Sequence, residues 1–100
     1  MVIDFHVHIF PDQLALRAIP KLAQGAGIPA FLDGTLGQLQ RSLAWAKIDR
    51  AVLQPVATRP EQVAQINCWL AELRSQKIDA FAAIFPGSKT WEQDLDRIVE

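Results

Sequence analysis

The sequence predicts an α/β fold in which parallel strands are joined by crossover helices. Short segments rich in β-branched and aromatic residues, at 2–9, 50–56 and 79–85, alternate with segments of helical periodicity. This alternation is typical of a parallel sheet, because consecutive parallel strands need a long connection between them, usually a helix.

Three apolar stripes at spacings of three and four residues predict helices in segments 36–46, 63–73 and 91–99. A threonine precedes each segment and has Glu or Gln three residues later, which is typical of a capping box. These pairs are Thr35 with Gln38, Thr58 with Glu61, and Thr90 with Gln93. The tryptophans of the three helices are expected to anchor them on the sheet: Trp45, Trp69 and Trp91.

The connection after the first strand is less regular. Asp12 is expected to cap a short helix that runs through Leu22. Pro20 should kink or end this helix, because proline lacks a backbone N–H and clashes with the preceding turn. The segment 25–34, which holds three glycines and a proline, is expected to form a loop.

Charge and cysteine content exclude several classes of protein. Ten basic and eleven acidic residues give a net charge of −1, so nothing favours nucleic acid or an anionic membrane as a partner. Cys68 is the single cysteine, which excludes an internal disulfide, and its helical surroundings predict a partly buried, inert thiol. No segment resembles a signal peptide or a membrane span, so we expect a cytoplasmic protein.

The stretch IDFHVHIFP, residues 3–11, carries the candidate chemistry. Because successive side chains of a strand point to opposite faces, Asp4, His6 and His8 are expected to share one face. The apolar residues between them are expected to face the core: Ile3, Phe5, Val7 and Ile9. Two imidazoles two residues apart can bind one cation between their ring nitrogens. Hydrogen-bonded core histidines, or a pair at the surface, are the alternatives.

The same stretch resembles the first-strand signature of the amidohydrolase superfamily, in which an H-x-H pair ends strand one of a metal-containing (β/α)8 barrel. The nearer resemblance is to the branch that includes aminocarboxymuconate-semialdehyde decarboxylases and "amidohydrolase family 2" hydrolases. It depends on the proline of HIFP and on the later runs IDRAVLQPV, INCWLAEL, IDAFAAIFPG and WEQDLDRI. TatD-like nucleases and PHP-type phosphoesterases open in a similar way.

This resemblance implies that His6 and His8 bind a divalent metal ion, with Zn²⁺ as the first choice. Asp4 would not bind the metal ion itself but would hold the strand or an imidazole in position. The resemblance also implies that the chain forms the first three βα units of a (β/α)8 TIM barrel. Residues 1–100 would be the N-terminal part of one domain that continues beyond residue 100, where the remaining ligands and the base would lie.

The activity implied by the resemblance is hydrolysis of C–N, ester or lactone bonds by metal-activated water. Non-oxidative decarboxylation on the same metal platform is the alternative, as is a non-catalytic α/β fragment with an incomplete site. The expected substrate is a small molecule, which could carry a carboxylate; Arg59, just after the second strand, could bind that group or be a solvated loop residue. An oligomer is compatible with the sequence, and the 100 residues alone are expected to be inactive.

Overall fold

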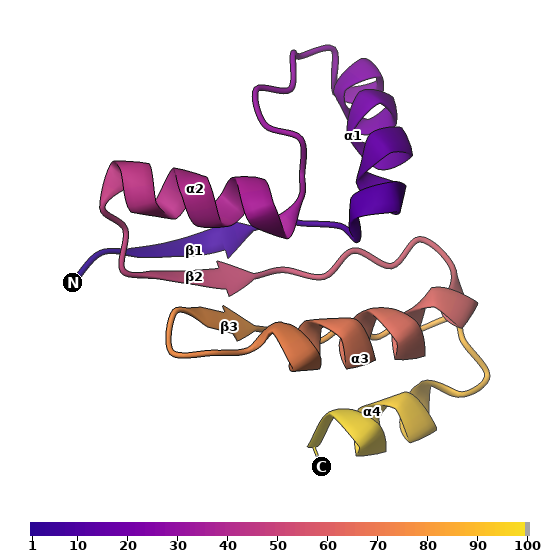
Figure 1. Cartoon of the computed structure of the whole chain (residues 1–100). Helices are drawn as coiled ribbons and strands as arrows, with labels where there is room; N and C mark the ends of the chain where they lie inside the picture. The colour runs from indigo at the N-terminus through magenta and orange to yellow at the C-terminus, as the bar shows by residue number, and fades with distance from the viewer. Residues whose placement is uncertain (100) are drawn as a thin grey trace.

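The computed structural model describes residues 1–99 and shows a mixed α/β architecture built on a three-stranded parallel sheet (Figure 1). The strands lie in the order β1-β2-β3, so each strand pairs with the next one along the chain. The predicted α/β class with parallel strands and crossover helices is confirmed. The elements are β1 (Ile3–Val7), α1 (Asp12–Ala26), α2 (Leu36–Ala46), β2 (Arg50–Leu53), a 3₁₀ turn η1 (Pro60–Gln62), α3 (Val63–Leu73), β3 (Ile78–Ala80) and α4 (Trp91–Val99).

The central strand β2 forms the middle of the hydrophobic core. It is hydrogen-bonded on both sides, and Ala51 and Leu53 are fully buried. These two residues share one face of the strand, where Leu39 and Leu43 of α2 and Leu70 of α3 pack in a single cluster with them. Helices α2 and α3 therefore cover the same face of the sheet.

Aromatic side chains gather on the other face. Val52, which alternates with the two residues that meet the helices, is 7% exposed and lies on this side. Phe5 and Phe81 meet there edge to face, with ring centroids 5.9 Å apart, although each remains more than half exposed. This face also carries the side chains of Arg50 and Asp79 and is only thinly covered.

The strict alternation expected for the first strand is wrong, because β1 contains a register shift. Asp4 pairs with Ala51 and Val7 with Leu53, so three steps along β1 match two steps along β2. Such a bulge places Asp4 and Val7 opposite residues of the same face. As a result, Val7 packs against the core while Phe5 is 64% exposed.

The capping box predicted for α2 is confirmed in part, because the Thr35 hydroxyl caps the helix but the Thr35 N–H donates to Asp33 Oδ1 and not to the Gln38 side chain. The predictions for the other two helices need correction. Thr35 Oγ1 accepts a hydrogen bond from Gln38 N at 3.2 Å. Before α3, the side chain that caps the chain is Gln62 and not Glu61, since Gln62 Oε1 accepts from Thr58 N at 2.9 Å and from Arg59 N at 3.2 Å.

At the start of α4, Thr90 contacts Ser88 and Asp94 and not Gln93, and its N–H donates to Ser88 Oγ at 3.1 Å. The Thr90 carbonyl accepts from Asp94 N at 3.0 Å, and the Thr90 hydroxyl donates to Asp94 Oδ2 at 3.5 Å. Asp94 is one of the few buried polar residues, with 5% of its surface exposed. A short polar side chain one turn into the helix therefore takes the place of the predicted glutamine.

Helix α1 passes through Pro20 and ends only at Ala26, beyond its expected end. Pro20 removes the donor for the Leu16 carbonyl, but Leu16 is 77% exposed, so water can satisfy that carbonyl. The helix ends where Gly27 adopts a left-handed conformation with φ of 68°. Figure 1 shows α1 projecting away from the sheet, and Ala15 is the residue it buries.

Three further side chains differ from expectation. Trp69 packs against the core as predicted, but Trp45 is 88% exposed and Trp91 is 41% exposed, so neither is buried as a sheet anchor would be. Cys68 is exposed and not partly buried, because it faces away from the core stripe of α3. Within residues 1–99, every helix is too short or too polar to cross a membrane.

Candidate metal centre

His6 and His8 lie at the C-terminal end of β1 with their rings in contact. Their Nε2 atoms are 3.0 Å apart, their ring centroids are 4.9 Å apart, and the rings are inclined by 69°. Both side chains are exposed. The structure therefore brings together the two residues that the sequence singles out as metal ligands.

The second ring nitrogen of His8 determines how the pair is protonated. His8 Nδ1 lies 2.9 Å from the carbonyl oxygen of Gln54. A carbonyl oxygen can only accept, so Nδ1 carries the hydrogen and Nε2 carries the lone pair. In the cation-free protein His6 Nε2–H then donates to His8 Nε2. The His8 lone pair is directed toward the space between the rings.

The donor set fits a divalent ion of the zinc type. The two Nε2 atoms lie 3.0 Å apart on exposed rings, so His6 and His8 would both be able to hold one such ion through these atoms. Binding also requires His6 to carry its hydrogen on Nδ1 in place of Nε2.

Asp4 contacts the strand and not an imidazole. Its Oδ1 accepts from the backbone N–H of His6 at 3.4 Å, a long hydrogen bond. No hydrogen bond within residues 1–99 joins its carboxylate to either ring. Its contact in the structure is therefore with the backbone that carries the first imidazole.

The other candidate residue, Arg59, pairs with an acidic side chain of its own segment. Arg59 lies in the exposed segment after β2, and its Nε is 3.9 Å from Glu61 Oε1. In the described part of the chain it makes no hydrogen bond or ion pair with His6 or His8. No group of three or more His, Cys, Asp or Glu side chains suited to a metal ion occurs among residues 1–99.

Gln54 is the site residue that sequence reasoning missed. Besides its carbonyl contact with His8, it donates from its backbone N to Val7 O at 2.7 Å and from its side-chain Nε2 to Phe5 O at 3.0 Å. The only local signal is a glutamine directly after the apolar run of β2. Its partners lie 46 to 49 positions earlier in the chain, where no local pattern can point to them.

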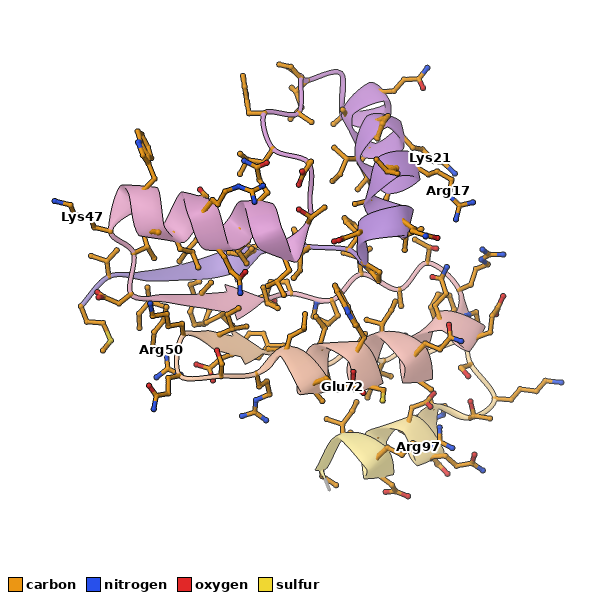
Figure 2. All side chains as sticks on the ribbon, viewed as in Figure 1. Arg17, Lys21, Lys47, Arg50, Glu72 and Arg97 are labelled. Carbon is orange, nitrogen blue, oxygen red and sulfur yellow. The ribbon has the colours of Figure 1, made fainter. Side chains whose placement is uncertain are left out.

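An ion pair lies toward the other end of the sheet. Arg50, which Figure 2 labels, lies at the start of β2. Its guanidinium binds the carboxylate of Asp79 on β3. Both side chains are roughly one-third to two-fifths exposed, at 34% and 41%. In parallel α/β proteins the chemistry gathers at the C-terminal ends of strands, whereas residues at the N-terminal ends serve stability. Arg50 therefore lies at the end of the sheet opposite the imidazole pair, and its ion pair with Asp79 joins β2 to β3.

Comparison with protein-family models, with curated proteins and with solved structures finds no match to this chain. The fold and the site themselves define it as a mixed α/β protein with a parallel sheet. At the C-terminal end of its first strand, two imidazoles meet through their Nε2 atoms.

Proposed function

We propose that this chain supplies the first two metal ligands of a metal-dependent hydrolase of the amidohydrolase type. The observation that carries the proposal is the pair of Nε2 atoms, 3.0 Å apart, at the C-terminal end of β1. Two exposed imidazoles in a solvated pair gain little from contact with each other, whereas one divalent cation between them uses both lone pairs. Zn²⁺ is the proposed ion, because it prefers such nitrogen ligands.

The arrangement of the sheet supports a barrel. Helices α2 and α3 lie on one face of the sheet, as in a (β/α)8 barrel, whereas doubly wound folds place helices on both faces. The strand order also follows the chain order, and β1 and β3 each have an unpaired edge within residues 1–99. We propose that these are the first three βα units of a TIM barrel, in which further strands pair with those edges.

The chemistry assigned to the residues of this chain is ligation and orientation. His6 and His8 would hold the cation through Nε2, and the Gln54 carbonyl would keep the His8 ring in its ligating orientation. A bound divalent ion would polarise a substrate carbonyl and lower the pKa of a water molecule. Because catalytic zinc normally has three protein ligands, the remaining ligand and the general base are assigned to strands outside residues 1–99.

A zinc titration of the purified chain by calorimetry tests the proposal. We expect weak binding of one ion per chain, because two imidazoles make half of a tetrahedral shell. His6→Ala and His8→Ala should each weaken binding by at least about tenfold. Lys47→Ala, an exposed change at the end of α2, is the matched control and should leave the affinity unchanged. Equal affinity in all four proteins would overturn the proposal.

Activity assays on the same protein distinguish between the possible reactions. Hydrolysis of small amides, esters or lactones is expected only when the missing ligands are present, so the 100 residues alone should show no turnover. Zinc-dependent turnover by these residues alone, lost in His6→Ala, would contradict the assignment of further ligands elsewhere. In a protein with the complete site, release of CO2 from a carboxylate substrate without hydrolysis would assign the platform to decarboxylation.

A further inference from the structure

We infer that Gln54 is the positioning residue of the imidazole pair, holding both the register shift of β1 and the tautomer of His8. The inference deepens the proposed function and rests on it only where a cation is concerned. Three groups of Gln54 bind the end of β1: the backbone N–H, the backbone carbonyl and the side-chain amide. No other described residue contacts this end of the strand through so many hydrogen bonds.

The side chain compensates for a defect in the sheet. Between the pairs Asp4–Ala51 and Val7–Leu53 the ladder is irregular, so the Phe5 carbonyl lies in the part of β1 that the shift removes from regular pairing. Gln54 Nε2 donates to that carbonyl at 3.0 Å. The side chain of Gln54 therefore gives this carbonyl a protein partner in the shifted register, although Phe5 is 64% exposed and water can also reach it.

The register shift and the imidazole pair depend on each other. The shift occupies the stretch that contains His6, and regular pairing resumes at Val7, whose carbonyl accepts from Gln54 N. The next residue, His8, returns to the same glutamine through Nδ1. One residue, directly after β2, thus contacts β1 where it is shifted, where pairing resumes and where the following ring is oriented.

The consequence for His8 is a fixed tautomer. A neutral histidine in water favours the hydrogen on Nε2, which blocks ligation through that atom. The Gln54 carbonyl reverses this preference, because it accepts a hydrogen bond from Nδ1–H and leaves the Nε2 lone pair toward His6. The ring is therefore prepared for a cation before any cation binds.

The test uses nitrogen-15 NMR of the cation-free protein, with Gln54→Met as the variant. Methionine matches glutamine in length but cannot donate to Phe5 O. The chain contains only two histidines, so long-range proton–nitrogen spectra show two sets of ring signals. The spectra are recorded at alkaline pH, in the range where a further change of pH no longer moves the ring signals, so that each tautomer is read directly.

In the unmodified protein we expect His8 in the Nδ1–H form and His6 in the Nε2–H form. Gln54→Met keeps the backbone N–H and carbonyl of residue 54 and removes only the side-chain contact with Phe5 O. Loss of that contact should loosen the carbonyl from the ring and shift His8 part of the way toward the Nε2–H form. Gln65→Met, at an exposed position of α3 with no side-chain hydrogen bond in the described residues, is the matched control and should leave both tautomers unchanged. An unchanged His8 tautomer in Gln54→Met would overturn the inference.

A zinc titration of the same proteins separates the two proposals. Gln54→Met should lower the zinc affinity by about tenfold to a hundredfold, as loss of a ligand-orienting contact typically does. A shifted tautomer together with no zinc binding by the unmodified protein would retain the role of Gln54 and overturn the proposed function. Should Gln54→Met fail to fold, Gln54→Asn, whose amide is one methylene shorter, poses the same question with a polar side chain.

Discussion

At the scale of single residues, Thr35 connects two groups that set the start of α2. Its hydroxyl donates to Asp33 Oδ1 at 2.7 Å and accepts from Gln38 N at 3.2 Å. Its backbone N–H donates to the same carboxylate oxygen at 2.9 Å. A chain of hydrogen bonds therefore runs from Asp33 through the cap into the first turn of the helix.

These hydrogen bonds make the contribution of Asp33 to folding stability depend on pH. The hydrogen bond from the Thr35 hydroxyl, followed by that from its backbone N–H, lowers the pKa of Asp33 from its ordinary value of 3.8, and Arg41 acts in the same direction. A carboxyl whose pKa is lower in the folded state stabilises that state when ionised. Its contribution is complete above the ordinary pKa and disappears as the pH falls through the lowered value.

The matching experiment compares the protein with Asp33→Asn. At neutral pH the unmodified protein should melt at the higher temperature, and the difference should shrink as the pH falls below 3.8. Thermal unfolding followed by circular dichroism across this range measures it. A difference that stays constant with pH would show that the charge of Asp33 does not stabilise the cap.

At the scale of helices and strands, the most informative comparison is between two glycines of the first connection. Gly34 has φ of 76°, and a Cβ built on it would lie 2.5 Å from Cδ1 of Ile19. Its carbonyl also accepts from Phe10 N at 2.8 Å, so the loop is tied to the end of the first strand. Gly25 lies within α1 and has nothing within 4 Å of its Cβ position.

Alanine should therefore act in opposite directions at these two positions. Gly34→Ala should lower the free energy of unfolding by at least about 1–2 kcal/mol, because a left-handed conformation and a steric overlap are both imposed on it. Gly25→Ala should raise it by up to about 1 kcal/mol, the difference in helix propensity. Urea unfolding of both variants measures the change, and a shift in the same direction for both would contradict this account.

The elements that the sequence predicts well are those determined by local periodicity. The apolar stripes place α2 and α3 within their observed bounds, because each stripe is complete within one helix. The end of α1 was not predictable, since the cost of Pro20 depends on whether the carbonyl of Leu16 reaches water. Strands were predicted too long, since pairing ends where a neighbouring strand ends.

The candidate site also has one part that the sequence predicts and another that depends on contacts distant in the sequence. The imidazoles of His6 and His8 could be predicted, because two residues on one strand end suffice to bring them together. The register shift beside Asp4 could not, because it depends on how β1 pairs with a strand more than forty residues later. Gln54 was missed for the same reason, since its contacts are made by tertiary folding alone.

At the scale of the whole molecule, stability depends on β2, which is paired on both sides and buried on both faces. Leu53 is fully buried in the cluster that joins the sheet to α2 and α3. Leu53→Ala should lower the free energy of unfolding by about 2–5 kcal/mol, the usual cost of such a cavity. Leu16→Ala, at a position that is 77% exposed, is the control and should change it by less than about 0.5 kcal/mol.

Chemical denaturation of the two leucine variants tests this ranking. A loss at Leu16 equal to that at Leu53 would mean that α1 and the sheet contribute equally to stability. The burial pattern argues against that result, because Ala15 is the buried residue of α1 whereas β2 buries every residue after Arg50.

The strand order β1-β2-β3 also has a consequence for synthesis on the ribosome. Because each strand pairs with the next one made, β1 and α2 can dock on β2 once residue 53 has left the exit tunnel, before the residues of β3 have emerged from it. The imidazole pair needs only one residue more, Gln54, to complete its hydrogen bonds. The nascent chain can therefore assemble its candidate metal ligands while nearly half of the present sequence is still untranslated or inside the tunnel.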